Sequence, residues 1–237
     1  MGRSNNPEQV CNLKQKKRMG VIVMEKERKL FLKLLPLTGL IGAFAYFIHV
    51  FLGGILWEGY SHISQTISEL TGSQAPDADL LKIFTNIYGI CMIIFSIYLL
   101  LAVRREKLHI TVKVGALLLV IMEITSYIGY SLFPLDTSGD LSGFQNFMHI
   151  VVTAVVVLCT IGTGYFMGLG MRNTPAYRKL GVFILICSVI ITISGAMTPI
   201  FMANEVPVSG LTERINIFTL QTCLSVISIF LYRKQAK

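Results

Sequence analysis

The sequence predicts an all-α integral membrane protein, a polytopic helix bundle with six transmembrane helices. Of its residues, 53% are hydrophobic and only 14% are charged, and the mean hydropathy is +0.65, whereas a soluble domain carries about 25% charged residues. The apolar residues form long runs, and a helix of about 20 such residues crosses a hydrocarbon core of about 30 Å. The basic residues gather between these runs, where lipid headgroups lie.

Six apolar runs reach the length of a membrane span. The β-branched stretch Val151–Val157 also fits a buried strand, but its run extends past about 20 residues, which favours a helix. We therefore expect transmembrane helices at Leu34–Leu56, Ile83–Val103, Ile110–Phe133, Phe147–Gly170, Leu180–Met202 and Ile215–Tyr232.

Basic residues predict how the spans are oriented. Nineteen of the 21 Lys and Arg residues lie in segments that six spans place on one face. The positive-inside rule makes that face cytoplasmic. The opposite connectors hold eight acidic residues, with Lys82 and Arg214 as their basic residues. We expect a multi-pass protein of the cell membrane with its N-terminus and C-terminus in the cytoplasm.

The chain divides into three parts. Residues 1–33 form a basic cytoplasmic arm, 34–232 the transmembrane domain and 233–237 a basic cytoplasmic tail. The arm is polar and poorly patterned, as is typical of a disordered segment. Alternatively, residues 1–23 precede the native start. The spans leave no room for a second folded domain.

Composition excludes several classes of partner and cofactor. The five cysteines lack the paired spacing of a structural zinc site, so we expect no metal. The basic residues lie in short clusters between apolar runs, which favours membrane lipids over nucleic acid as the partner. No cofactor is expected, although His49 and His149 on different spans offer an alternative, a haem with two histidine ligands. The sequence does not indicate an oligomeric state.

Glu123 is the acidic residue deepest within a predicted span. Ionisable groups within the membrane are costly and often functional. Glu123 is a candidate proton carrier, ligand contact or acid/base; the alternative is a protonated carboxyl bonded to a neighbouring helix. Tyr130 follows seven residues later on the same helix face.

The segment Trp57–Leu70 joins the first two spans on the acidic face. Its polar residues recur at helical spacing and include Glu69, opposite an apolar stripe. This pattern predicts a short amphipathic helix lying on the outer surface.

Four further polar residues lie near the outer ends of spans. Asp136 follows a Pro-containing turn, and His149 lies in the span after it. Glu213 and Arg214 begin the last span, where Arg214 opposes the charge bias. We expect Arg214 to pair with a carboxylate such as Asp136, Glu69 or Glu213, or to bind an anionic ligand.

Several short motifs occur in one order along the chain. They are Gly53-Gly54, Tyr60-x-x-Ile63-Ser64-x-x-Ile67-Ser68-Glu69-Leu70, Phe133-Pro134-x-Asp136, His149 and Gly210-Leu211-x-Glu213-Arg214-Ile215. With these motifs the chain resembles the prokaryotic membrane family catalogued as domain of unknown function 998, over about residues 35–232. The resemblance implies a six-helix bundle in a prokaryotic cytoplasmic membrane and implies no activity.

The polar residues together predict a pocket that opens outward. Glu69, Asp136, His149, Glu213 and Arg214 would line it, with Glu123 at its floor. We favour a protein that binds or transports a small or lipidic ligand. A membrane enzyme acting on lipid or envelope substrates, with His149 and a carboxylate as acid and base, is one alternative. A structural or regulatory subunit, whose polar residues tie helices together, is the other.

Overall fold

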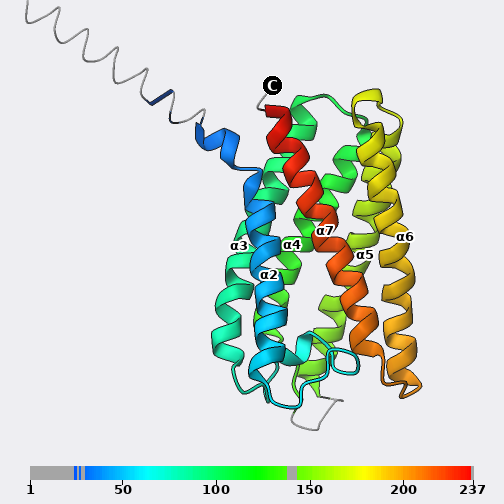
Figure 1. Cartoon of the computed structure of the whole chain (residues 1–237). Coiled ribbons are helices and arrows are strands. Elements are labelled where there is room, and N and C mark those ends of the chain that lie inside the picture. Colours follow the sequence, from blue (N-terminus) through cyan, green and yellow to red (C-terminus); the bar gives the residue numbers. More distant parts are fainter. Residues whose placement is uncertain (1–23, 26, 28–29, 138–142, 236–237) are drawn as a thin grey trace, which may run out of the picture.

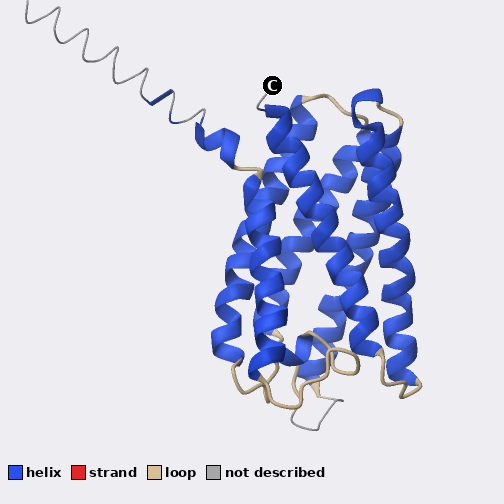
Figure 2. Ribbon diagram, viewed as in Figure 1, coloured by secondary structure: helices blue, strands red, loops and turns tan. Residues whose placement is uncertain are grey.

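Six long helices make up most of the chain that the structure describes. The computed structural model describes residues 24–25, 27, 30–137 and 143–235 of the chain. Within these ranges the secondary structure is helical and has no strand (Figure 2). The long helices run along one another in an up-and-down bundle (Figure 1). They are α2 (Leu37–Leu56), α3 (Ala78–Arg105), α4 (Ile110–Leu132), α5 (Phe144–Arg172), α6 (Arg178–Ala203) and α7 (Ser209–Gln235), with short 3-10 helices η1 (Ser68–Thr71) and η2 (Pro175–Tyr177) in two connections.

All six long helices are long and apolar enough to cross a membrane. Many of their large aliphatic side chains face outward, and Ile55, for example, is 79% exposed. A soluble monomer rarely shows such a continuous apolar surface, whereas lipid accepts it without cost. The predicted fold class is therefore confirmed, and the chain is a multi-pass membrane protein.

Two helices begin more than one turn before the apolar runs that the sequence predicts as spans. α3 starts five residues before its apolar run and α7 starts six residues before its own. The additional residues include polar groups, Asp79 in α3 and both Glu213 and Arg214 in α7. A hydropathy argument finds only the part of a helix that meets hydrocarbon, so a polar start of a helix is missed.

The first span begins later than predicted because of a proline. Leu35 and Pro36 form a turn between helical residues 30–34 and α2. Pro36 has no N–H to continue a helix. The carbonyl of Pro36 accepts a hydrogen bond from the hydroxyl of Ser228 in α7, at 2.6 Å. The turn is thus tied to the last helix.

The helices close into a ring. Each helix packs against the next in the sequence, and α2 also packs against α7. We call the end with connections 57–77, 133–137 and 204–208 the acidic end, which lies at the bottom of Figure 1. The opposite end, with connections 106–109 and 173–177 and the end of α7, is the basic end. A small apolar core of Val50, Ile67, Leu70 and Leu81 fastens the 57–77 connection to the acidic end.

Candidate functional site

The connection after α2 is a compact loop rather than the amphipathic helix that the sequence predicts. Its helical part is limited to η1, with turns before it. The Glu69 carboxylate accepts hydrogen bonds from the Thr66 N–H (2.8 Å), the Thr66 hydroxyl (3.0 Å) and Gln65 Nε2 (3.2 Å). The side chain of Gln65 in turn accepts from the Ser61 N–H at 2.8 Å. Side chains therefore bind the N–H groups that a helix would use, and the helix prediction is wrong for this reason.

Arg214 lies at the centre of the contact between this loop and α7. The residue is 6% exposed. It donates to His62 Nδ1 (3.1 Å), to the Gln65 carbonyl (2.8 Å), to the Gly210 carbonyl (2.9 Å) and to the Tyr60 hydroxyl (2.6 Å). These bonds use four of the five N–H groups of the guanidinium. The expected ion pair with Asp136, Glu69 or Glu213 does not form among the described residues, because neutral acceptors surround the charge.

Further bonds hold the loop on the first turns of α7. The Glu213 carboxylate accepts from the Ile67 N–H at 2.7 Å. Leu211 N–H donates to the Ile63 carbonyl at 2.9 Å, and the Ser209 hydroxyl to the Ser64 carbonyl at 3.0 Å. We call Tyr60, His62, Gln65, Glu69, Glu213 and Arg214 the acidic-end network.

Two glycines permit this close approach. A Cβ added to Gly54 would lie 2.2 Å from His62, and one added to Gly210 would lie 2.1 Å from the Gln65 carbonyl oxygen. A side chain at position 210 would push the Gln65 backbone away from α7, and one at position 54 would displace the His62 ring. Gly54 and Gly210 of the sequence motifs thus have a structural explanation.

Two titratable groups of the loop respond to burial and to Arg214. Burial raises the pKa of Tyr60 to about 12, although the Arg214 charge opposes the rise. Burial, and next the Arg214 charge, lower the pKa of His62. Since Arg214 donates to its Nδ1, His62 is neutral and carries its proton on Nε2.

Asp136 and His149 belong to a second group, between the end of α4 and the start of α5. Asp136 accepts from the Ser73 hydroxyl at 2.8 Å, and its N–H donates to Asn146 at 2.9 Å. His149 Nδ1 donates to the Phe133 carbonyl at 2.8 Å, which leaves Nε2 as an acceptor. The His149 ring also lies 5.1 Å from the ring of Tyr130. These contacts join α4, α5 and the 57–77 connection.

Glu123 lies apart from both groups, deep within the bundle. It is 1% exposed. Tyr88 of α3 is its polar neighbour, but neither carboxyl oxygen has a hydrogen-bond partner of normal geometry among the residues that the structure describes. The Tyr88 hydroxyl accepts from Gln221 Nε2 at 3.1 Å, while Gln221 Oε1 has no partner in the same ranges.

Tyr46 and His49 of α2 extend this group. The Tyr46 ring centroid lies 4.8 Å from that of Tyr88 and 5.4 Å from that of His49. His49 is 2% exposed, and both of its ring nitrogens lack a partner within the described part of the chain. We call Tyr46, His49, Tyr88, Glu123 and Gln221 the interior polar cluster.

The interior polar cluster was only partly visible in the sequence. The sequence draws attention to Glu123 and His49 but not to Tyr46, Tyr88 or Gln221. Their similar position along the helices could have indicated the cluster. Tyr46, Tyr88, Glu123 and Gln221 all lie 9 to 12 residues from the acidic-end termini of their helices. That spacing corresponds to about 14–18 Å along each helix.

The six candidate residues therefore fall into three places. Glu69, Glu213 and Arg214 share the acidic-end network, Asp136 and His149 join α4 to α5, and Glu123 lies in the interior polar cluster. Among the described residues there is no group of three or more His, Cys, Asp or Glu side chains that could hold a metal ion. Haem binding by His49 and His149 stays a prediction.

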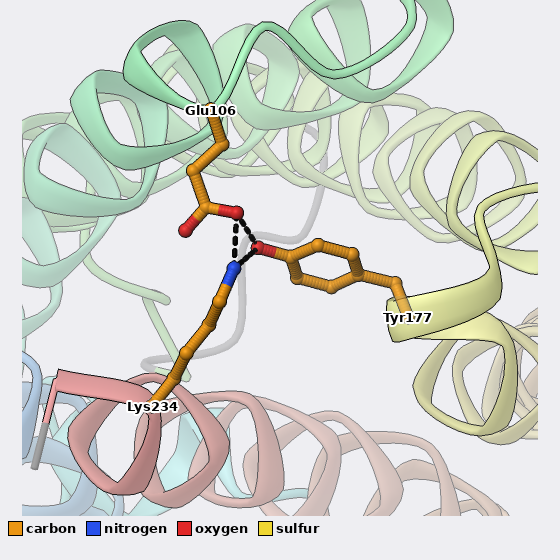
Figure 3. A network of polar contacts seen from close by, with 3 residues as sticks. All are labelled: Glu106, Tyr177 and Lys234. Atoms are coloured by element: carbon orange, nitrogen blue, oxygen red, sulfur yellow. Dashed lines mark hydrogen bonds and ion pairs between the residues drawn. The ribbon is translucent and has the colours of Figure 1, made fainter. Parts of the chain in front are cut away.

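The basic end has its own polar network, which Figure 3 shows. Tyr177 of η2 donates to the carboxylate of Glu106, which follows α3, and Lys234 of α7 bonds to both (Figure 3). The Lys234 ammonium also lies 4.4 Å from the centroid of the Tyr177 ring. This network fixes the end of α7 to two connections of the basic end.

A family model described as "Protein of unknown function (DUF998)" matches residues 40–229 of the chain. The match includes most of each of the six long helices. The resemblance carried by the sequence motifs is confirmed. No curated protein and no solved structure matches the chain.

Proposed function

Since the chain belongs to the family of membrane proteins described as domain of unknown function 998, we propose its function from its geometry: it binds or transports a small or lipidic ligand, and the ligand contacts the interior polar cluster. The observation that carries the proposal is Glu123, a carboxyl group that is buried among helices beside Tyr88 and has no hydrogen bond of normal geometry in the described residues.

The energetic argument is one of cost. A buried polar group without a partner destabilises a protein by about 1–3 kcal/mol, and a charged one by more. Six side-chain atoms of this kind are buried among the described residues, and five of them belong to His49, Glu123 and Gln221. A cluster of buried polar atoms without hydrogen-bond partners is typical of a functional site, where a ligand or a proton supplies the partner.

The cluster also indicates the chemistry of the ligand. Glu123 and Gln221 present acceptor oxygens, and His49 presents one donor and one acceptor. Arg214, the residue expected to hold an anionic group, gives four of its N–H groups to the protein. A ligand with hydroxyl or ammonium donors therefore suits the cluster better than an anionic one.

The experiment compares Glu123→Leu with wild type and with Glu58→Leu, a control at an exposed carboxylate of the acidic end. Removing the unpartnered carboxyl is expected to raise the free energy of unfolding by about 1–3 kcal/mol. Mass spectrometry of small molecules released from the purified proteins is expected to show a compound in wild type and in Glu58→Leu that is missing from Glu123→Leu.

Loss of stability in Glu123→Leu would contradict the proposal, because it would make Glu123 a tie between helices, as in the structural-subunit alternative. If wild type releases no compound, the free energies of unfolding of Glu123→Leu and wild type are the deciding comparison. A more stable Glu123→Leu supports a ligand site, and a less stable one supports a structural role for Glu123.

We further propose that the basic end faces the cytoplasm, so that the interior polar cluster is reached from the outer side. The distribution of Lys and Arg supports this orientation. Cysteines introduced at Arg104 and at Asp77 test it with a membrane-impermeant thiol reagent on intact cells. Labelling at position 77 alone is expected, and labelling at position 104 alone would reverse the orientation.

A further inference from the structure

A groove of about 510 Å³ opens on the lipid-facing surface at the basic end. One wall is α3, which contributes Ile94, Ile97 and Leu101, and the other is the segment before α2, which contributes Leu32 and Leu35. We infer that this groove binds one anionic phospholipid, with an acyl chain along α3 and the phosphate at Arg105. This site is separate from the interior polar cluster and does not depend on the proposed function.

The polarity of the groove changes along α3. Aliphatic side chains and the ring of Tyr98 line it from Ile94 to Leu101, and Arg105, Glu106 and Gln235 line its end. From Ile94 to Arg105 the helix rises about 16 Å. The apolar part points toward the middle of the membrane and the charged part lies at its surface. An occupant must therefore be apolar at one end and polar at the other, as a phospholipid is.

The charge at the rim of the groove selects the headgroup. Glu106 also lines the rim, but its carboxylate is bound to Lys234 and Tyr177. Arg105 is exposed and forms no ion pair with any residue that the structure describes. The rim thus keeps one uncompensated positive charge. A guanidinium binds a phosphate through two parallel hydrogen bonds, and basic pockets between membrane helices recognise anionic headgroups.

The same charge argues against other occupants. A helix from a second protein would cover Arg105 and leave its charge without a partner unless that helix carried a matching carboxylate. A zwitterionic lipid would bring its own positive group to the rim. An anionic phospholipid satisfies both the aliphatic wall and the charge.

Arg104 provides a matched control because it is the neighbouring exposed arginine and does not line the groove. Purified full-length protein in detergent is titrated with phosphatidylglycerol or phosphatidylcholine, and native mass spectrometry counts the lipids bound. Arg105→Ala is expected to weaken phosphatidylglycerol binding about fivefold, the effect of losing one basic residue near an anionic surface. Arg104→Ala is expected to bind as wild type does.

Two results would overturn the inference. Equal losses in Arg104→Ala and Arg105→Ala would mean general attraction to a basic surface. Equal binding of the two lipids by wild type would mean that no headgroup is recognised.

A second variant tests the acyl part of the groove if Arg105→Ala does not fold. Leu101→Trp fills the groove, while Ile121→Trp places the same ring on an exposed position of α4 outside it. Only Leu101→Trp is expected to lose the preference for phosphatidylglycerol. Retention of the preference would place the lipid elsewhere.

Discussion

The acidic-end network and the interior polar cluster both bury ionisable side chains, but they differ in the hydrogen bonds that these side chains form. Arg214 is 6% exposed and has four hydrogen bonds to the protein. Glu123 is 1% exposed and has none among the described residues. A buried charge with several hydrogen bonds holds elements together, whereas a buried polar group without partners costs stability. Depth alone therefore does not show whether a buried polar group stabilises the fold; its hydrogen bonds do.

Replacing Arg214 is expected to have the largest effect. Arg214→Met removes bonds to the loop and leaves acceptors on Tyr60, His62 and Gln65 without their donor. Hydrogen bonds to charged groups contribute about 1.5–3 kcal/mol each and are not additive, so a loss of about 3–5 kcal/mol is expected. Trp57 is the single tryptophan and stacks near Tyr60, so its fluorescence reports on the loop.

Arg214→Lys sharpens this test. An ammonium keeps the charge but cannot reach acceptors on several sides at once. The midpoint of unfolding of Arg214→Lys, followed by Trp57 fluorescence, should lie between the midpoints of wild type and Arg214→Met. If Arg214→Met unfolds at the same midpoint as wild type, the acidic-end network does not hold the loop.

Replacing Glu69 is expected to have a moderate effect. Glu69→Ala removes the acceptor of three bonds within the loop and should cost about 1–2 kcal/mol, as loss of a capping side chain does. Glu69→Gln keeps one acceptor oxygen and should recover part of that loss. Glu58→Ala, at an exposed carboxylate, is the control and should melt as wild type does. Equal melting of Glu69→Ala and Glu58→Ala would exclude a structural role for Glu69.

A change in the interior polar cluster is expected to act in the opposite direction. His49→Phe removes two buried nitrogens without partners and keeps a ring against Tyr46, so the free energy of unfolding should rise by about 1–2 kcal/mol. Circular dichroism of the helices measures it. A decrease in stability would place His49 among the structural groups and remove the contrast between the two regions.

The smallest expected effect is a pH dependence of the loop. The pKa of His62 is lower in the folded protein than in the unfolded chain, because of burial and the Arg214 charge. The unfolded chain therefore takes up the proton first as the pH falls below about 6.5, and stability is full above that pH and decreases below it. The midpoint of unfolding followed by Trp57 fluorescence should be lower at pH 5 than at pH 7. His62→Gln keeps an acceptor for Arg214 and does not titrate, so its midpoint should depend less on pH. If its midpoint depends on pH as much as that of wild type, another group causes the shift.

The sequence predicts the spans well because each depends on a local property, apolar length. It fails at the loop after α2, where helical spacing is present but Glu69 and Gln65 bind the backbone N–H groups first. That competition depends on side-chain geometry rather than on hydrophobic period. A polar spacing of 3 and 4 residues therefore does not by itself distinguish an amphipathic helix from a self-capped loop.

The grouping of polar residues was the least predictable part. The sequence shows Arg214 as a basic residue on the acidic face, but three of its four acceptors, on Tyr60, His62 and Gln65, lie about 150 positions away in the sequence. Likewise Tyr88 and Gln221 meet only because α3 and α7 face each other inside the ring. Such meetings are properties of tertiary packing, which no single stretch of sequence contains.

The closure of the ring by α2 and α7 has a consequence for biosynthesis. These are the first and last of the six helices to be made, and the Pro36 carbonyl meets the Ser228 hydroxyl across their contact. The bundle therefore cannot close until the ribosome has released the final helix into the bilayer. Until then the face of α2 that packs against α7 has no partner. Premature termination before residue 209 would leave five helices that cannot form a closed ring and that lack both Arg214 and Lys234.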